Sequence, residues 1–351
     1  MFQKQFSAIV NDLEIAPDLT ISHPDYPPLS LDPDLGTRYS QIPIELQTKF
    51  LMTRVRNYLH DLYFTGRLRP IATLENTEPT SPLVKNNLVN GVDRDFLRQL
   101  DRRNPSRGYL DPDWQIVAET EDRELVVLKD GLHLHIDRQF HIPHHLRQAK
   151  IGDLTPVYLP HNLVGIDTYI IVGDLGFPQP DPCHSDQSSP LVRVYFNISP
   201  DSAVEIAEQL TGELNQLGIQ FQLGILHNPT RFYRRDGATL HLSQTSYVAA
   251  QTHLAALYRS HQADFSPDVP IFTKQLAPGL GIAEEPLTTN SFGIHRCELV
   301  AEGLVSAFYQ GQHSATERLT QIATAWDRAQ IDQSHPYLNP TTTDNYDLYV
   351  I

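Results

Sequence analysis

Three arginines in separate segments are the residues whose type and position could best bind an anion. Arg193 lies in the predicted strand LVRVYFNI, where Tyr195 falls on the same face. Arg235 is the last arginine of the segment TRFYRRD, and Arg296 follows His295 at the start of a predicted helix. Because a guanidinium grips phosphate in a bidentate way, we expect an anion pocket, for phosphate, formed by these three arginines and His295. The alternative is that the arginines pair with some of the 42 acidic residues at the surface.

Lysine is the second residue type that could do chemistry here. The chain has six lysines against 21 arginines. A desolvated lysine can lose its proton and act as a base, whereas arginine stays protonated. Lys129 in VVLKDG and Lys274 in FTKQL lie on predicted strands or at their ends. Most lysines are solvated surface groups. Each of the two is therefore a candidate base only if it lies beside the expected anion pocket.

Histidine is abundant, with 16 in the chain, five of them in GLHLHIDRQFHIPHH. His133 and His135 share a strand face at a spacing compatible with metal. No set of acids or cysteines completes a metal motif around them, so we expect no metal. The sequence contains no phosphate-binding Walker loop, nucleophile elbow or dinucleotide fingerprint, and we expect no cofactor.

Composition excludes several classes of protein. The net charge of −15 argues against a general nucleic-acid or membrane-surface binder. No apolar stretch reaches the length that spans a bilayer, and the N-terminus lacks the apolar region of a secretory signal. Two cysteines, Cys183 and Cys297, make no disulfide framework. We therefore expect a cytoplasmic protein in a reducing compartment.

The pattern of apolar residues changes near residue 105. Before it, helical periodicity predicts helices at 2–14, 43–66 and 87–103. After it, alternation predicts several strands, and residues 191–227 read as strand, helix and strand, which is typical of a crossover unit. We predict an α+β fold, with a twisted, mainly antiparallel sheet and flanking helices. A helical N-terminal region (1–105) precedes the mixed part (106–351), as two domains or as one domain with a helical cap.

Seven blocks of the sequence occur in an order that matches a known family. They are NPSRGYLDPDWQIV (104–117), VVLKDGLHL (126–134), VRVYFNI (192–198), YRRDGATLHL (233–242), FTKQLAPGLGIAEEP (272–286), SFGIHRC (291–297) and HPYLNP (335–340). With these blocks the chain resembles the HopA family of type III effectors and its relatives in class V lanthipeptide and thioamitide clusters. More distantly it resembles the OspF/SpvC phosphothreonine lyases.

The resemblance implies a phosphothreonine-lyase-like domain over 106–351 that removes phosphate from phospho-Ser/Thr by β-elimination. The substrate would be a precursor peptide that a separate kinase has phosphorylated. Related lyase domains carry a K-x-H strand, a helix and then a strand with a base lysine. Arg193 stands at the first lysine of that pattern and Tyr195 at the histidine acid, whereas Gln222 or Gly224 stands at the base lysine.

Neither glutamine nor glycine can take up the α-proton, so two alternatives stay open. In the first, Lys274, or failing that Lys129, supplies the base, and the chain is a lyase with Tyr195 as its acid. In the second, the chain is a degenerate lyase that binds phosphopeptides or acts as a scaffold. A third possibility, an effector that acts on host proteins, has no support besides the family resemblance.

Overall fold

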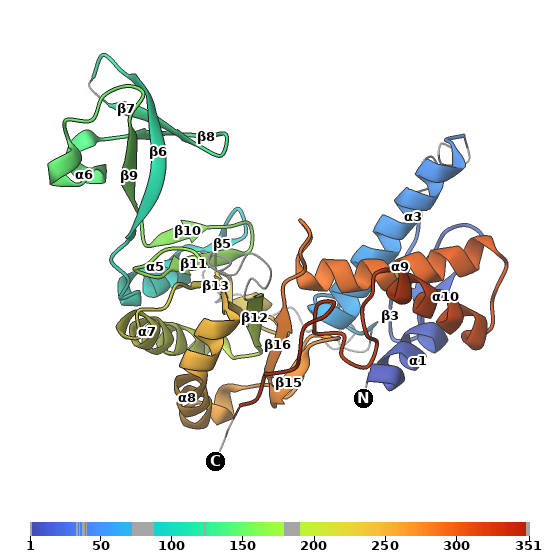
Figure 1. Cartoon of the computed structure of the whole chain (residues 1–351). Coiled ribbons are helices and arrows are strands. Elements are labelled where there is room, and N and C mark those ends of the chain that lie inside the picture. Colours follow the sequence, from blue (N-terminus) through green and yellow to red (C-terminus); the bar gives the residue numbers. More distant parts are fainter. Residues whose placement is uncertain are drawn as a thin grey trace.

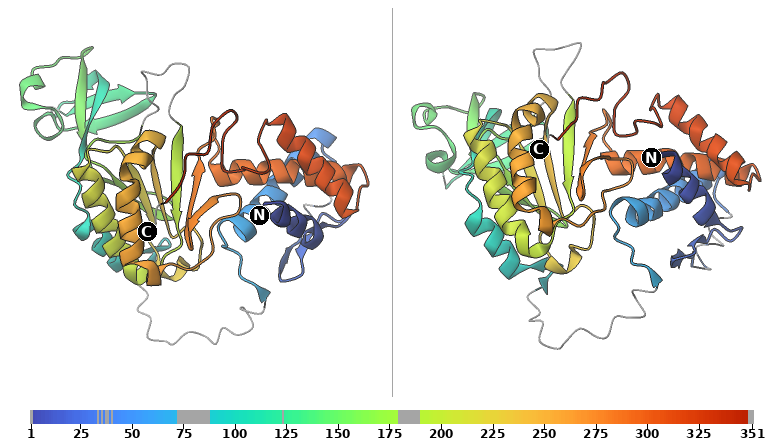
Figure 2. Two further views of the ribbon diagram at one scale, coloured as in Figure 1. Left: turned by 60° about the horizontal axis from the view of Figure 1, so that its bottom comes forward. Right: turned by 90° about the horizontal axis from the view of Figure 1, so that it is seen from below.

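The computed structural model describes residues 2–32, 34, 36, 39, 41–71, 88–122, 124–178 and 190–348. The predicted α+β class is confirmed, because helices and antiparallel sheets alternate along the described chain (Figure 1). A central sheet separates a small sheet at one end from a group of helices at the other (Figures 1 and 2). None of the helices within the described residues is both long enough and apolar enough to cross a membrane.

The central sheet has seven strands in the order β10-β11-β13-β14-β12-β16-β15, and every neighbouring pair is antiparallel. The strands are β10 (Asn162–Val164), β11 (Thr168–Val172), β12 (Leu191–Phe196), β13 (Gln222–Leu226), β14 (Ala238–Ser243), β15 (Lys274–Ala277) and β16 (Leu280–Glu284). Since β12 and β13 both run antiparallel to β14, they are parallel to each other. Helix α7 (Pro200–Gln216) joins them, so the predicted crossover exists with β14 inserted between its two strands.

The two faces of the central sheet differ in polarity. One face carries buried apolar side chains such as Val194, Leu240 and Leu223, which occupy one row of the ladder. Helices α7 and α8 (Gln244–Ser260) contact strands β12, β13 and β14. The residues that alternate with this apolar row must point to the opposite face.

The N-terminal helices pack against the C-terminal ones. Helix α1 (Phe2–Asp12) contacts α10 (Ala315–Arg328), and α3 (Ile44–Leu59), continued by the π-helical turn η1 (His60–Phe64), contacts α9 (Phe292–Tyr309). These helices and the central sheet share one hydrophobic cluster. The predicted boundary at residue 105 remains a prediction about independent folding, but this cluster contains residues from both sides of it.

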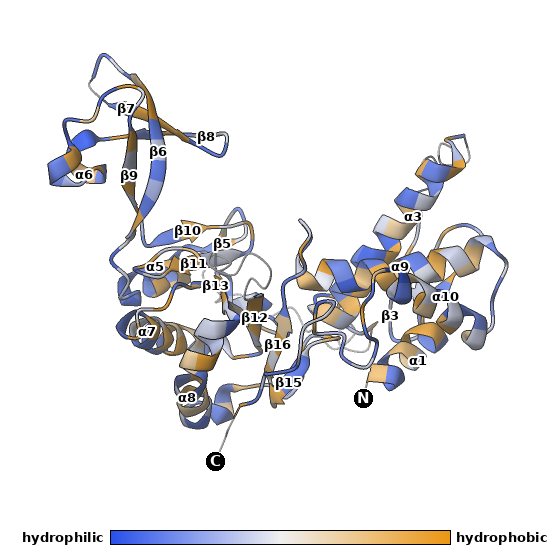
Figure 3. Ribbon diagram, viewed as in Figure 1, coloured by the Kyte–Doolittle hydropathy of each residue, from blue (hydrophilic) through white to orange (hydrophobic). Residues whose placement is uncertain are grey.

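The small sheet projects from the rest of the molecule (Figures 1 and 2). Its order is β8-β7-β6-β9, and it has a hydrophobic cluster of its own around Trp114, Ile116 and Val157. Figure 3 shows apolar residues in its strands as well as in the helices at the other end. Its elements are β6 (Tyr109–Glu119), β7 (Leu125–Lys129), β8 (Leu132–Ile136), α6 (Arg138–His141), η2 (His144–Leu146) and β9 (Leu154–Leu159).

The helix predicted at 87–103 begins later than expected. Asn90 and Gly91 have φ angles of 52° and 84°, and they form the turn of the hairpin β4 (Leu88–Val89) and β5 (Val92–Asp93). Asp93 then caps the helix by accepting from the N–H groups of Asp95 and Phe96. The remaining short elements are α5 (Arg94–Arg103), β1 (Glu14–Ile15), β2 (Ile21–His23), β3 (Tyr26–Leu29), η3 (Pro229–Arg231) and η4 (Gln262–Asp264).

Candidate functional site

The polar face of the central sheet carries two cross-strand rows of residues. Residues paired directly across strands share a face, so the register defines both rows. The first row is Gln222, His241, Arg193 and Ala283, and the second is Gly224, Thr239, Tyr195 and Gly281. Together with Glu285, two residues beyond Ala283, these residues are called the polar face below. The predicted strand with Arg193 and Tyr195 on one side therefore forms the centre of this face.

Arg193 is held by a carboxylate of the chain itself. Its Nε lies 2.5 Å from Oε1 of Glu285, and the Oε2 of Glu285 accepts a hydrogen bond from the N–H of Phe292 at 3.3 Å. Phe292 is the first residue of α9, where free N–H groups and the helix dipole favour an anion. Arg193 and the start of α9 thus share one anionic group, the carboxylate of Glu285.

Tyr195 lies in the same site with an unused hydroxyl group. The side chain is only 1% exposed, and the ring of Phe64 packs edge-on against it at 5.5 Å. Burial raises the pKa of Tyr195, and Glu285 raises it further, while Arg193 opposes both. The hydroxyl is therefore protonated at neutral pH. Arg193 approaches its oxygen but can only donate, so the O–H proton has no acceptor among the residues that the structure describes.

Two histidines near Arg193 and Arg296 are held neutral. Burial, and then the charge of Arg193, place the pKa of His241 well below its ordinary value. Burial and Arg296 lower the pKa of His295 to about 4. Nδ1 of His295 lies 2.6 Å from Nη1 of Arg296. Because a guanidinium only donates, Nδ1 accepts and the ring proton sits on Nε2.

Arg296 and Arg235 bind backbone carbonyls. Arg296 is fully buried and donates to the carbonyls of Pro336 at 2.7 Å and Leu338 at 2.8 Å. Burial lowers its pKa to about 10. Arg235 donates to the carbonyls of Leu62 and Tyr63 at 3.1 and 3.2 Å. These bonds hold both guanidinium groups against the backbone, while Arg296 stays close enough to Tyr195 and Glu285 for their charges to act on it. Arg193 binds a carboxylate at this site, and the pocket of three arginines stays a prediction.

The two candidate lysines lie away from Arg193. Lys274 pairs with Ile282 while Arg193 pairs with Ala283, and the side chains of adjacent residues on β16 point to opposite faces. Nζ of Lys274 binds Asp344 at 2.8 Å. The register therefore separates Lys274 from Arg193, and its base role, which required the two to meet, has no support in this arrangement.

Lys129 lies in the small sheet, on β7. Its Nζ binds Asp111 at 2.7 Å and the carbonyl of Pro112 at 2.9 Å. The sheet that carries it projects away from the central sheet (Figure 1). Lys129 therefore stabilises the small sheet, and this placement gives its predicted base role no support.

Residues 335–348, called the strap below, are the last segment of the described chain. Glu284, which is fully buried, accepts hydrogen bonds from the N–H of Asn339, the Thr342 hydroxyl and the Tyr346 hydroxyl, each at 2.7 Å. Arg296 supplies the bonds to Pro336 and Leu338 described above. The arginine of the SFGIHRC block and an acid of the IAEEP block thus fasten the strap.

Sequence reasoning missed His241 and Glu285. Both lie in blocks noted above, YRRDGATLHL and FTKQLAPGLGIAEEP. The alternation of Thr239 and His241 with leucines was a signal for a polar strand face. No signal in the sequence indicated that this face meets the face of Arg193, because that depends on strand pairing.

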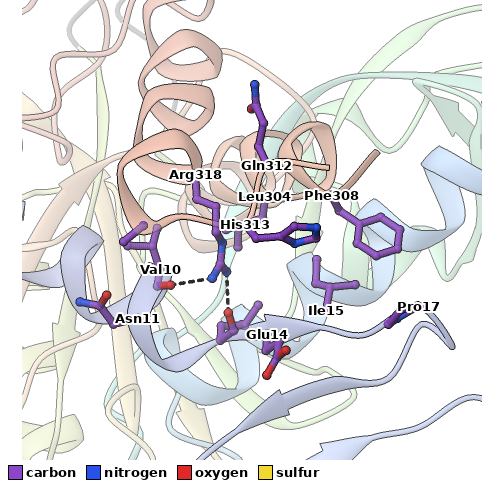
Figure 4. Close-up of a pocket in the computed structure, with 12 residues that line it drawn as sticks. Val10, Asn11, Glu14, Ile15, Pro17, Leu304, Phe308, Gln312, His313 and Arg318 are labelled. Carbon is purple, nitrogen blue, oxygen red and sulfur yellow. Dashed lines mark hydrogen bonds between the residues drawn. The ribbon is translucent and has the colours of Figure 1, made fainter. Parts of the chain in front are cut away.

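Figure 4 shows a pocket between α1 and the α9–α10 connection, in which Arg318 points toward α1. Arg318 donates to the carbonyls of Val10 at 2.6 Å and Leu13 at 2.5 Å, and so stabilises the end of α1. Among the residues that the structure describes, no group of three or more His, Cys, Asp or Glu side chains is arranged to hold a metal ion.

Acid is expected to destabilise the fold through His241 and His295. Their pKa values in the folded chain lie below the ordinary value of 6.5. Below that pH the unfolded chain therefore binds protons that the folded chain does not, and the free energy of unfolding falls as pH falls. We expect a loss of at least about 2 kcal/mol between about pH 7 and 4.5, measured by denaturant unfolding.

A pair of variants separates this effect from the titration of carboxylates. His295→Gln is expected to reduce the loss, and His144→Gln, at an exposed position, to leave it unchanged. Equal losses in the two variants would contradict the role of His295.

Comparison with known proteins finds a matching family and similar solved structures, two of which are described here. Residues 159–338 match the sequence model of the HopA1 effector protein family. A solved effector protein from Pseudomonas syringae pv. tomato strain DC3000 is 15% identical with a TM-score of 0.39, covering 77% of this chain and 94% of its own. One from Pseudomonas syringae pv. syringae strain 61 is 15% identical with a TM-score of 0.40, covering 84% and 98%. None of the curated proteins matches the chain.

Proposed function

Because the chain belongs to the HopA1 effector protein family, we propose that it is a lyase-like protein that binds a phosphorylated serine or threonine in a peptide and leaves the phosphate in place. The phosphoryl group binds at Arg193 and the amino end of α9. The observation that carries the proposal is the separation of this anion site from both candidate lysines.

The groups at the site suit phosphate recognition. Arg193 and the first N–H of α9 meet at one carboxylate of the chain, and both are donors that phosphate uses in proteins. The buried hydroxyl of Tyr195 adds a third donor without a partner. A phosphoryl group has three strong acceptor oxygens, so it can use all three donors.

Retention of the phosphate follows from what the site lacks. β-Elimination breaks a Cα–H bond and the Cβ–O bond, forms the Cα=Cβ double bond and releases phosphate. A base must take the α-proton. Lys274 lies on the opposite face and Lys129 on another sheet, so neither reaches a phosphoserine held by Arg193. This placement favours the degenerate lyase, which was the second of the two alternatives from the sequence.

β-Elimination remains a second candidate because of His241. Its imidazole is neutral and stands beside Arg193 in the same row, so it could accept a proton. Its lowered pKa makes it a weak base. Formation of dehydroalanine that His241→Asn abolishes would favour this candidate.

Arg193→Gln is expected to weaken binding of a phosphoserine peptide by at least about 10-fold, since a charge-assisted bond to phosphate is lost. Fluorescence anisotropy with a labelled peptide measures the affinity, and the unphosphorylated peptide serves as reference. Lys129→Ala is the matched control, because it removes one positive charge from the small sheet. If both variants bind like the unmodified chain, the site at Arg193 is wrong.

A further inference from the structure

We propose that Glu285 is a built-in competitor for the anion site, and that only a ligand with the charge of a phosphoryl dianion displaces it. The inference rests on the proposed function, because it concerns the same site. It assigns to Glu285 the selection of phosphorylated over merely acidic ligands.

Glu285 makes the contacts that a bound anion would make. One carboxylate oxygen lies against Nε of Arg193, and the other accepts from the N–H of Phe292. Side chains of the pair are 20% and 16% exposed, so water screens the interaction weakly. A second anion cannot use the same donors until this carboxylate leaves.

The glutamate does not satisfy the site completely. The hydroxyl proton of Tyr195, a side chain only 1% exposed, has no acceptor among the described residues. Arg193 Nε and Glu285 Oε1 are close, yet neither takes part in an aligned hydrogen bond. The helix-capping residue Ser291 makes no side-chain capping bond. A buried donor without an acceptor is unfavourable, so a ligand that accepts from Tyr195 gains over Glu285.

Glu285 can leave without unfolding its surroundings. Its backbone is fixed, because its N–H donates to the carbonyl of Leu191 and its carbonyl accepts from the side chain of Asn339. Its neighbour Glu284 is fastened to the strap. Displacement therefore needs only rotation of the Glu285 side chain toward solvent.

Tethering makes the competitor strong and selective. A group on a short tether has an effective concentration on the order of millimolar or more. A single carboxylate in a ligand offers the same charge as Glu285 and gains little by the exchange. A phosphoryl group carries a charge of about −1.5 to −2 and one more oxygen. The preference for phosphorylated over acidic ligands thus equals the difference in free energy between two replacements of Glu285, one by a phosphoryl group and one by a carboxylate.

The test compares the unmodified chain with Glu285→Gln. Glutamine keeps the length of the side chain and an oxygen that can accept from Phe292, but it lacks the charge. We expect the variant to bind a phosphoserine peptide about 10-fold more tightly. It should also bind the peptide with aspartate in place of phosphoserine, which the unmodified chain binds no better than the serine peptide.

Glu205→Gln is the matched control, because it removes one negative charge from an exposed position of α7. If Glu285→Gln disturbs the fold, Glu285→Asp keeps the charge on a shorter side chain and should also tighten binding. Equal or weaker binding by folded Glu285 variants overturns the competitor while leaving the proposed function standing. Failure of every variant and of the unmodified chain to bind the phosphopeptide overturns both.

Discussion

Glu284→Ala is expected to lower the free energy of unfolding by about 3 kcal/mol. The carboxylate is fully buried and accepts from three donors, two of them hydroxyl groups of Thr342 and Tyr346. Removal leaves these donors without an acceptor, and each buried donor in that state costs about 1–3 kcal/mol. Because the strap can partly relax, the total loss should be smaller than the sum of the costs of the three donors.

Urea unfolding measures this loss, and two further variants locate it. Tyr346→Phe removes one of the three bonds and should cost about 1 kcal/mol. Glu205→Ala, at an exposed position of α7, should cost less than about 0.5 kcal/mol. A loss below 1 kcal/mol for Glu284→Ala would show that the strap contributes little to stability.

Gly224→Lys is expected to confer β-elimination on a chain that, in our proposal, leaves the phosphate in place. Gly224 and Tyr195 stand in one row, two strands apart, which is roughly 10 Å between their Cα atoms. A lysine side chain can cross most of that distance. An added Cβ would meet the Thr239 hydroxyl oxygen at 3.2 Å, so the substitution needs a small shift of that side chain.

A positive charge nearby favours the neutral form of such a lysine, and Arg193 stands in the adjacent row of the same face. Dehydroalanine from a phosphoserine peptide, detected by mass spectrometry, should rise at least about 10-fold over the unmodified chain. Val248→Lys adds the same charge to an exposed position of α8 and should form none. If Gly224→Lys binds the peptide and stays inactive, a missing base does not explain the lack of activity.

Local patterns in the sequence predicted the fold well. The spacing of apolar residues identified α1 and α3, and the strand–helix–strand unit at 191–227 is β12, α7 and β13. Alternation also placed Arg193 and Tyr195 on one face of β12. These features depend on residues close together in the sequence, which is why they could be read from it.

The site was harder to predict because it depends on pairing between distant segments. A shift of one residue between β12 and β16 would have put Lys274 on the face of Arg193. The partners of Arg235 and Arg296 are backbone carbonyls at residues 62–63 and 336–338. Every residue has a carbonyl, so the sequence gives no sign of which ones will need a buried donor.

Mass spectrometry of a phosphoserine peptide recovered after binding to the unmodified chain tests the central claim most directly. We predict that the bound peptide keeps its phosphate and that the unphosphorylated peptide is not retained. Recovery of a peptide that has lost phosphoric acid and contains dehydroalanine would contradict retention. Equal recovery of the phosphorylated and unphosphorylated peptides would contradict recognition of phosphate.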